Sequence, residues 1–133
     1  MASPVLDSFA LLVFLFKEKG HQKIVDVFDA AADDDETTLI AAPNWAEVRY
    51  IVQRKVGVER WSDVRSTILA LPITVVPADQ ALAEAAGALK AAKKMSLADC
   101  FAAALAQQQR SPVYTGDPEF KAVAGETKIG WLK

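Results

Sequence analysis

The amino-acid sequence predicts an α/β protein in which helices cover both faces of a mainly parallel sheet. Short, strand-like apolar runs alternate along the chain with longer segments whose apolar residues recur at helical spacing. This alternation is typical of a sheet enclosed between two layers of helices. The length of 133 residues fits one domain, residues 1–133, built around a single core.

The first third of the chain contains two predicted strands and two predicted helices. Residues 4–6 are a short β-prone start. The Asp-Ser pair that follows ends this strand and precedes a predicted helix over about 9–19. The segment "QKIVDVFDAAA" (22–32) spaces its apolar residues for a second helix. The run "TLIAA" (38–42) predicts a buried strand.

The middle of the chain continues the alternation of strands and helices. Pro43 and Asn44 supply a stop and an N-cap for a helix that runs to about Val56, where Gly57 is a C-terminal signal. Residues 59–69 form another predicted helix, and "ITVV" (73–76) is a predicted strand.

The last third adds two helices and two short strands. Asp79 is the expected cap of a helix that runs through about Lys93, and Ser96 opens the next helix, through about Gln109. Strands are expected at 112–114 and at 128–132, with the turn "TGDPE" after the first of them.

Charge and cysteine content exclude several classes of protein. The net charge of −2 argues against a general nucleic-acid coat protein, although a nucleic-acid enzyme needs only a local basic patch. One cysteine allows no internal disulfide, and the chain lacks the Cys/His pairs of a structural zinc site. The N-terminus has no basic signal-peptide start, and the apolar run 9–16 is too short to span a bilayer. A cytoplasmic protein away from membranes is therefore expected.

Four carboxylates fall where predicted strands end or predicted helices begin. They are Asp7 after the first strand, Glu47 and Asp99 in the first turns of two helices, and Asp117 just past the strand "VY". Ligands of parallel sheets bind beyond the carboxyl ends of the strands, so these acids are expected at one edge. A divalent cation would remove their mutual repulsion, and ligands that are all oxygen favour Mg²⁺ or Mn²⁺ over zinc.

Each acid taken alone also has a purely structural interpretation. Ser96-x-x-Asp99 resembles a capping box, in which Glu or Gln is the usual partner. Asp7 fits an N-cap, Glu47 suits the positive end of a helix dipole, and Asp117 fits an ordinary turn. Capping and metal binding are compatible, so both interpretations stay open for each acid. The arrangement of all four at one edge favours a site.

Around these acids the sequence resembles the PIN-domain family, and within it the VapC-type toxins of bacterial toxin–antitoxin pairs. The resemblance covers nearly the whole chain. It rests on "VLDSFALL", "APNWAEVRYIV", "KMSLADCFAAALA" and "VYTGDPEF", which carry Asp7, Glu47, Asp99 and Asp117 in the family's order. It implies a small three-layer α/β/α sandwich that hydrolyses RNA phosphodiester bonds as an endoribonuclease, with Mg²⁺ or Mn²⁺ bound by the four acids.

The resemblance also implies supporting residues and partners. By similarity, the hydroxyls of Ser8 and Thr115 support the acidic cluster, and Glu47 is either a metal ligand or a general base that acts through water. A cognate VapB-type antitoxin is the implied partner, and it commonly covers the site of such toxins.

An RNA substrate requires a local cationic surface on this acidic protein. Lys90, Lys93 and Lys94 precede the Asp99 helix and are candidates to contact phosphates, although lysines also favour helix C-termini for dipole reasons. The run "FALLVFLF" (9–16) is apolar on every side of its predicted helix, so part of it is expected to line a partner groove or a homodimer interface.

Two other classes of function fit the same outline. A phosphoacceptor receiver module also has an acidic, Mg²⁺-binding edge, but receivers usually carry adjacent acids on the first strand, where this chain has only Asp7. The other class is a binding protein whose acids merely cap helices. Among other reactive side chains, His21 is expected at the surface and Cys100 in the core. RNA cleavage with EDTA and Mg²⁺ controls separates the three classes.

Overall fold

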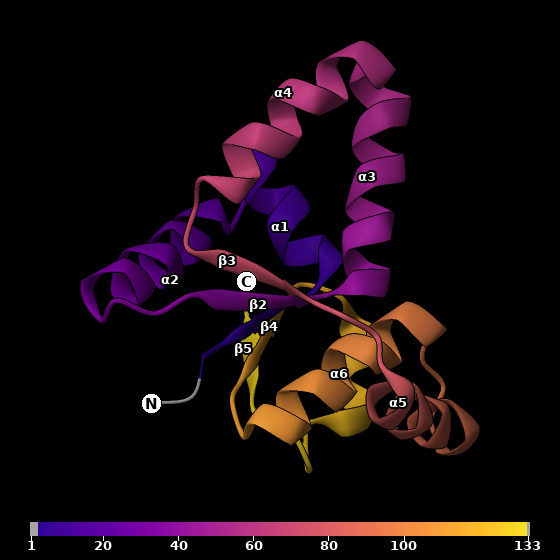
Figure 1. Cartoon of the computed structure of the whole chain (residues 1–133). Coiled ribbons are helices and arrows are strands. Elements are labelled where there is room, and N and C mark those ends of the chain that lie inside the picture. Colours follow the sequence, from indigo (N-terminus) through magenta and orange to yellow (C-terminus); the bar gives the residue numbers. More distant parts are fainter. Residues whose placement is uncertain (1–2, 133) are drawn as a thin grey trace.

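One sheet of five parallel strands runs through the centre of the computed structural model, which describes residues 3–132. The strand order is β3-β2-β1-β4-β5, and each pair of neighbours is parallel. The strands are β1 (Val5–Leu6), β2 (Thr38–Ala41), β3 (Ile73–Val76), β4 (Val113–Thr115) and β5 (Ile129–Trp131). The carboxyl end of the central strand β1 therefore lies between those of β2 and β4 (Figure 1).

Six α-helices and one 3₁₀ helix connect these strands within the described residues. They are α1 (Ser8–Leu15), α2 (His21–Asp33), α3 (Ala42–Val56), α4 (Val58–Leu69), α5 (Gln80–Ala92), α6 (Leu97–Gln109) and the 3₁₀ helix η1 (Pro118–Val123). The predicted caps of α5 and α6 are confirmed, since Asp79 accepts a hydrogen bond from Leu82 N and Ser96 accepts one from Asp99 N. Between residues 3 and 132, no helix has the length and apolar character to cross a lipid bilayer.

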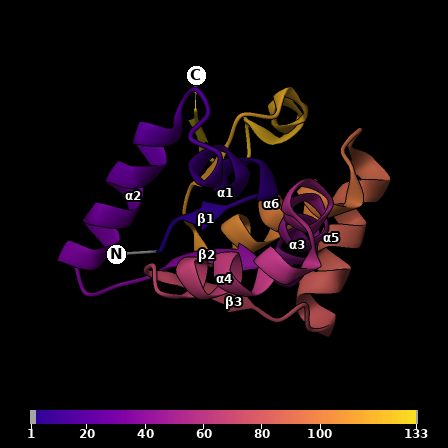
Figure 2. The same cartoon turned by 90° about the horizontal axis from the view of Figure 1, so that it is seen from above.

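Neighbouring residues of each strand face opposite layers. Val5 and Ala41 pack with α5, α6 and η1, whereas Leu6 and Ile40 pack with α1, α2, α3 and α4. Figure 1 shows these two groups of helices on opposite sides of the sheet, and Figure 2 shows α1 between α2 and α3. The predicted three-layer α/β/α sandwich with a parallel sheet is confirmed.

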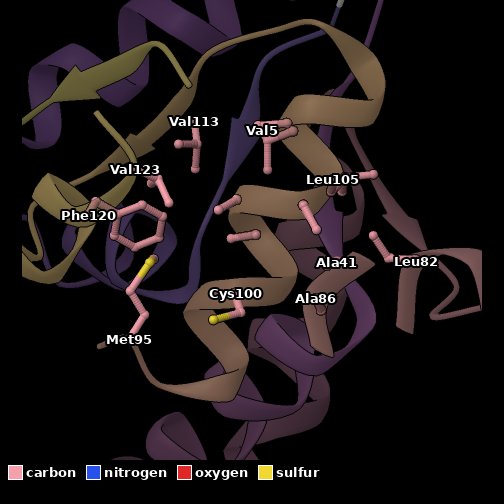
Figure 3. Packing of buried hydrophobic residues seen from close by; sticks show 14 residues of the cluster. Val5, Ala41, Leu82, Ala86, Met95, Cys100, Leu105, Val113, Phe120 and Val123 are labelled. Carbon is pink, nitrogen blue, oxygen red and sulfur yellow. The ribbon is translucent and has the colours of Figure 1, made fainter. Parts of the chain in front are cut away.

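The core on the α6 side is built largely from small side chains of that helix. Cys100, Ala102, Ala103 and Ala106 are fully buried, as predicted for the cysteine. Figure 3 shows Cys100 within the same cluster as Val5, where α6 crosses the strands. Because the distance between packed elements depends on the side chains at the contact, small residues bring α6 close to the sheet. The first turn of α6 is thereby held against rigid structure.

Two predicted helix boundaries are wrong. Helix α1 ends at Leu15 rather than near residue 19, because Lys17 takes a left-handed φ of 51° that stops the helix. Helix α3 begins before Pro43, since a proline in the first turn loses no intrahelical hydrogen bond and need not stop a helix. Asn44 consequently lies inside α3 instead of capping it, and Glu47 lies in the second turn instead of the first.

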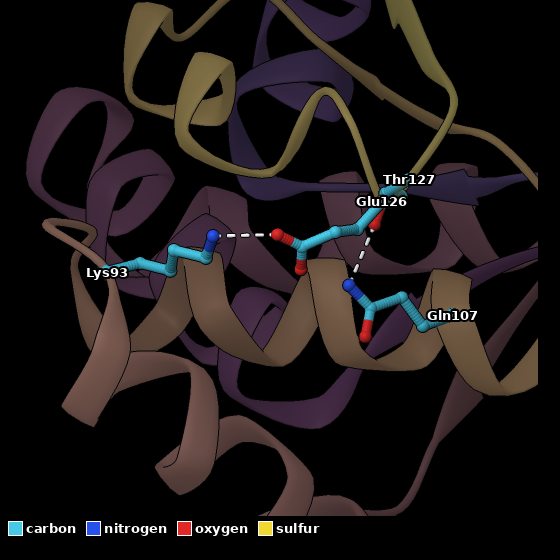
Figure 4. Close-up of polar contacts among 4 residues, drawn as sticks. All are labelled: Lys93, Gln107, Glu126 and Thr127. Atoms are coloured by element: carbon cyan, nitrogen blue, oxygen red, sulfur yellow. Dashed lines mark hydrogen bonds and ion pairs between the residues drawn. The ribbon is translucent and has the colours of Figure 1, made fainter.

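Two polar contacts hold the segment after η1 against α5 and α6. Lys93 Nζ lies 2.7 Å from Glu126 Oε1, and Gln107 Nε2 donates a hydrogen bond to Thr127 Oγ1 at 2.8 Å (Figure 4). Lys93 is the C-cap residue of α5, and Gln107 belongs to α6. The residue that ends α5 and a residue of α6 therefore both contact the loop that follows η1. These contacts help to hold η1 in its position.

Candidate metal centre

Asp7 opens α1 directly after the central strand and is fully buried. Its Oδ1 accepts a hydrogen bond from Ala10 N at 2.8 Å, so the prediction of an N-cap is confirmed. Its Oδ2 is also buried and has no hydrogen-bond partner among residues 3–132. One oxygen therefore caps the helix, while the other is costly to leave without a ligand.

The environment of Asp7 disfavours its ionised form. Burial is the largest effect, and together with the negative charges of Asp117 and Glu47 it raises the pKa of Asp7 from 3.8 to about 7, against the lowering contacts with Thr115 and the Ala10 N–H. A nearby cation would act in the opposite direction, because positive charge favours the carboxylate.

Glu47 projects from α3 and is held by a hydroxyl at the start of α1. Ser8 Oγ donates a hydrogen bond to Glu47 Oε1 at 2.7 Å. Because Ser8 follows Asp7 in the chain, this bond connects the first acid to the second across two helices. The contact supports the hypothesis that Ser8 is a supporting hydroxyl.

Asp99 lies in the first turn of α6 as predicted, but its carboxylate does not complete a capping box on its own helix. Ser96 Oγ accepts a hydrogen bond from Asp99 N at 3.2 Å, as in such a box. The Ser96 N–H, however, donates to Glu119 Oε1 at 3.0 Å. Glu119 thus takes the position that the third helical residue normally fills, which leaves the Asp99 carboxylate available to the other acids.

Asp117 is fixed by its own backbone and by the strand before it. The Asp117 N–H donates to Thr115 Oγ1 at 2.9 Å, and Asp117 Oδ1 accepts from Glu119 N at 2.9 Å. Thr115 is the last residue of β4 and is fully buried. The predicted turn is therefore an N-cap of η1, and the Thr115 hydroxyl supports the loop, consistent with its predicted role.

Among the described residues, three carboxylates lie close enough to share one ion, and neither Asp7 nor Glu47 is among them. Carboxylate oxygens of Asp99, Asp117 and Glu119, one from each residue, lie within 4.8 Å of one another. Burial raises the pKa of Asp99 to about 8, helped by a hydrogen bond with Glu119 and by the charges of Asp7 and Asp117. The negative charges of Asp117 and Glu47 in turn raise the pKa of Asp7. Each of the four predicted acids therefore interacts electrostatically with at least one of the others.

Glu119 is the member of this cluster that sequence reasoning missed. Hydrogen bonds from Ser96 N–H and with the Asp99 side chain lower the pKa of Glu119, in contrast to the raised pKa of Asp99. Asp99 therefore holds a proton more readily than Glu119 does. The sequence does show an acid two residues after Asp117 in "TGDPE", but interpreting this segment as a turn gave no reason to assign that acid to the site.

The donor set fits Mg²⁺ or Mn²⁺. The side chains that meet here offer carboxylate and hydroxyl oxygens, which hard divalent cations prefer. The other potential ligands lie apart from them: His21 opens α2 with Nδ1 3.0 Å from Glu18 O, and Cys100 is buried in the α6 core. The unpartnered Oδ2 of Asp7 and the raised pKa of two neighbouring acids are what a bound cation would relieve.

Asn44 connects the helices that carry Glu47 and Asp99. It is fully buried, and its Nδ2 donates to Ala98 O at 3.1 Å. Its Oδ1 has no partner within the described chain. The bond to the residue before Asp99 fixes α3 relative to the start of α6. Sequence reasoning missed this role because it treated Asn44 as a cap.

The three lysines predicted to contact RNA have different surroundings. Lys90 Nζ donates to Met95 O at 2.8 Å, and Lys93 is paired with Glu126. Lys94 is exposed, and its side chain takes part in none of the hydrogen bonds or ion pairs found between residues 3 and 132. Lys94 is therefore the most available of the three.

Comparison with known proteins assigns this sequence to a family. The sequence profile of the PIN domain matches residues 5–126, which include all the acids described above. No curated protein sequence matches the chain.

Solved toxin–antitoxin structures have the same fold. A DNA-bound VapBC from Salmonella typhimurium is similar with a TM-score of 0.77 at 18% identity, over 100% of both chains. A toxin–antitoxin complex from Klebsiella pneumoniae gives 0.73 at 20% identity, over 98% of both. The sarcin-ricin loop cleaving toxin VapC20 of Mycobacterium tuberculosis gives 0.69 at 16% identity, over 91% of this chain and 95% of that one. At these identities the likeness establishes the shared fold.

Proposed function

The chain belongs to the PIN-domain family, and from this premise we propose that it is a metal-dependent endoribonuclease of the VapC toxin type. The observation that carries the proposal is the convergence of the Asp99, Asp117 and Glu119 carboxylates at the carboxyl edge of a parallel sheet, with the buried carboxylate of Asp7 in their electrostatic neighbourhood. Such an edge is where ligands of open α/β sheets bind. Residues 1–133 would constitute one PIN domain.

In this proposal, one or more Mg²⁺ or Mn²⁺ ions are held by Asp7, Asp99 and Asp117, with Glu119 as an added ligand at the exposed side. When bound, the metal supplies positive charge that acidifies water and stabilises the charge that develops on phosphate. Glu47 acts as a further ligand or as a base, and its Oε2 is the atom that would accept a proton because Oε1 is engaged by Ser8.

The hydrogen bonds of the site keep the acids in place before a cation arrives. Asp7 and Asp117 are each anchored through one oxygen to a backbone N–H. Ser8 orients Glu47, and Thr115 orients the loop of Asp117. Ligands that are held in advance need no reorganisation at the moment of reaction, which is the main contribution of a protein to such chemistry.

Binding of RNA is proposed to use cationic residues near the acidic edge. Lys94 is the strongest candidate because it is exposed and unpaired within the described residues, while Lys90 and Lys93 already have partners in the chain. Contacts with phosphates would position RNA without selecting its sequence.

A cognate VapB-type antitoxin and a second copy of the chain are the proposed protein partners. Support comes from apolar side chains that remain exposed on α3 and α4, which Figure 1 shows extending from one side of the sheet. The exposed residues are Tyr50, Val58 and Leu69. The similar structures include toxins in complex with antitoxins. The cytoplasm is the compartment in which such a toxin would act on RNA.

The decisive experiment is a cleavage assay with purified protein and labelled single-stranded RNA. We expect cleavage with Mg²⁺ or Mn²⁺, none with EDTA, and none from Asp7→Ala or Asp99→Asn protein that retains its circular dichroism spectrum. Cleavage that persists in EDTA or in the variants would overturn the proposal. Growth arrest on expression, relieved by the neighbouring gene product, tests the toxin role separately.

A further inference from the structure

Phe9 is an exposed aromatic residue in a helix whose neighbouring apolar residues are buried. Ala10 and Leu11 are fully buried, and Phe14 packs edge-on against Phe28 with ring centroids 5.0 Å apart. Phe9 is 37% exposed and belongs to neither of the two core clusters found in residues 3–132. Core packing therefore does not explain an aromatic side chain at this position.

The ring of Phe9 rests on the loop that carries Asp117. A Cβ atom on Gly116 would lie 2.4 Å from Phe9 Cε1 and 2.9 Å from Phe9 Cζ, so the ring occupies the space that a side chain would fill. Gly116 does not have a positive φ. The close approach of the Phe9 ring is the feature that requires glycine here.

This contact places the ring beside the acidic cluster. Phe9 follows the buried Asp7 by two residues, and the glycine beneath its ring lies between Thr115 and Asp117. The ring therefore spans the start of α1 and the end of β4, the two elements that present the first and fourth acids. A phosphate bound at the acids would have its flanking nucleotides within the neighbourhood of this ring.

We infer that Phe9 is a stacking platform for an unpaired nucleobase next to the scissile phosphate. The inference rests on the proposed function and adds to it a residue that positions the substrate by holding one of its unpaired bases. Proteins recognise such bases by stacking them on aromatic side chains. Stacking tolerates any base, so Phe9 contributes affinity and register and leaves base identity to other contacts.

The test measures RNA binding in an Asp99→Asn background, in which the RNA stays intact. The probe is a short fluorescent single-stranded RNA that the unaltered protein cleaves, and it is compared with copies that carry one abasic nucleotide at each position in turn. The protein variants are Phe9→Leu, which removes the aromatic ring, and Phe9→Tyr, which keeps it. Phe14→Leu is the matched control for loss of a ring from the same helix.

Removal of the ring is expected to weaken binding by about five- to one-hundredfold, the range measured for base–aromatic stacking. Tyrosine should restore the affinity, and Phe14→Leu should leave it unchanged. One abasic position should reproduce the loss with Phe9 present and have no effect on Phe9→Leu protein, since the two changes remove the same contact.

Equal RNA affinity of the Asp99→Asn protein with and without Phe9→Leu would overturn the inference, and cleavage by the unaltered protein would show that the proposed function still holds. An abasic effect that is the same in both proteins would overturn it as well. Loss of antitoxin affinity without loss of RNA affinity would assign Phe9 to a protein contact instead. Absence of any RNA cleavage by the unaltered protein would remove the proposed function itself.

Discussion

Asp7→Asn should stabilise the protein at neutral to alkaline pH when no metal is present. The pKa of Asp7 is about 7 in the folded protein against 3.8 for an ordinary Asp, because burial disfavours the carboxylate. Between these values the folded protein keeps a proton that the unfolded chain has lost, so stability falls as pH rises across this window. A difference of about three pH units costs about 4 kcal/mol once both states are ionised.

Asparagine removes this cost while it keeps the cap, since Asn and Asp are similar N-cap residues for the Ala10 N–H. Burial of the new amide offsets part of the gain. The informative quantity is the change with pH: the unfolding free energy of Asp7→Asn minus that of the unaltered protein should rise by about 2 to 3 kcal/mol between pH 5 and pH 8.

Urea unfolding in EDTA at several pH values measures this difference, with tryptophan fluorescence and circular dichroism as probes. The matched control is Asp79→Asn, which makes the same substitution at an exposed N-cap that accepts from Leu82 N and so removes no buried carboxylate. Parallel pH profiles of Asp7→Asn and unaltered protein would refute the argument, because they would mean that Asp7 ionises as easily in the folded protein as in the unfolded chain. Added Mg²⁺ should stabilise the unaltered protein at pH 8 and have little effect on the variant.

Three further predictions concern the surroundings of the acids. Gly116→Ala should displace the Phe9 ring and destabilise the protein by at most about 1 kcal/mol in urea unfolding, because the ring is partly exposed and can shift, whereas Gly87→Ala, with open space around its Cβ, should be neutral or stabilising by up to about 1 kcal/mol. Glu119→Gln should keep the fold, because the amide oxygen still accepts a hydrogen bond, but should raise the Mg²⁺ concentration needed for half-maximal cleavage; an unchanged metal dependence would remove Glu119 from the ligand set. Lys94→Ala should weaken RNA binding equally for different sequences and reduce its salt dependence by about one phosphate contact; an unchanged salt slope would contradict that contact.

The fold was predictable because local signals and global arrangement agree. Strands such as β3 are short apolar runs, and helices α5 and α6 begin at polar caps, Asp79 and Ser96. The end of α1 was not predictable from its apolar run, since the run contains no glycine and the helix stops at a lysine, Lys17, with positive φ. Pro43 was ambiguous for a physical reason: proline both breaks a helix and suits its first turn.

The positions of the four acids followed from one topological rule, but their contacts did not. Nothing in the local sequence distinguishes a Glu119 that ends a turn from one that caps a helix 23 residues earlier. The hydrogen bond of Asn44 to Ala98 spans 54 residues and is equally invisible to local patterns. Contacts of this kind depend on how the loops close, which the spacing of apolar residues does not specify.

Capping, which is one of the two interpretations of these acids in the sequence, leaves room in the structure for the proposed metal binding. A carboxylate has two oxygens, and in Asp7 and Asp117 one of them is tied to a backbone N–H. Asp99 differs from these two, because Glu119 accepts the hydrogen bond of the Ser96 N–H and neither oxygen of the Asp99 carboxylate caps its own helix. The cap holds Asp7 in its buried position, where burial first and the neighbouring negative charges second raise its pKa. In the proposed metal site, the helix caps also hold the ligands in place, so loss of a cap should lower metal affinity as well as stability.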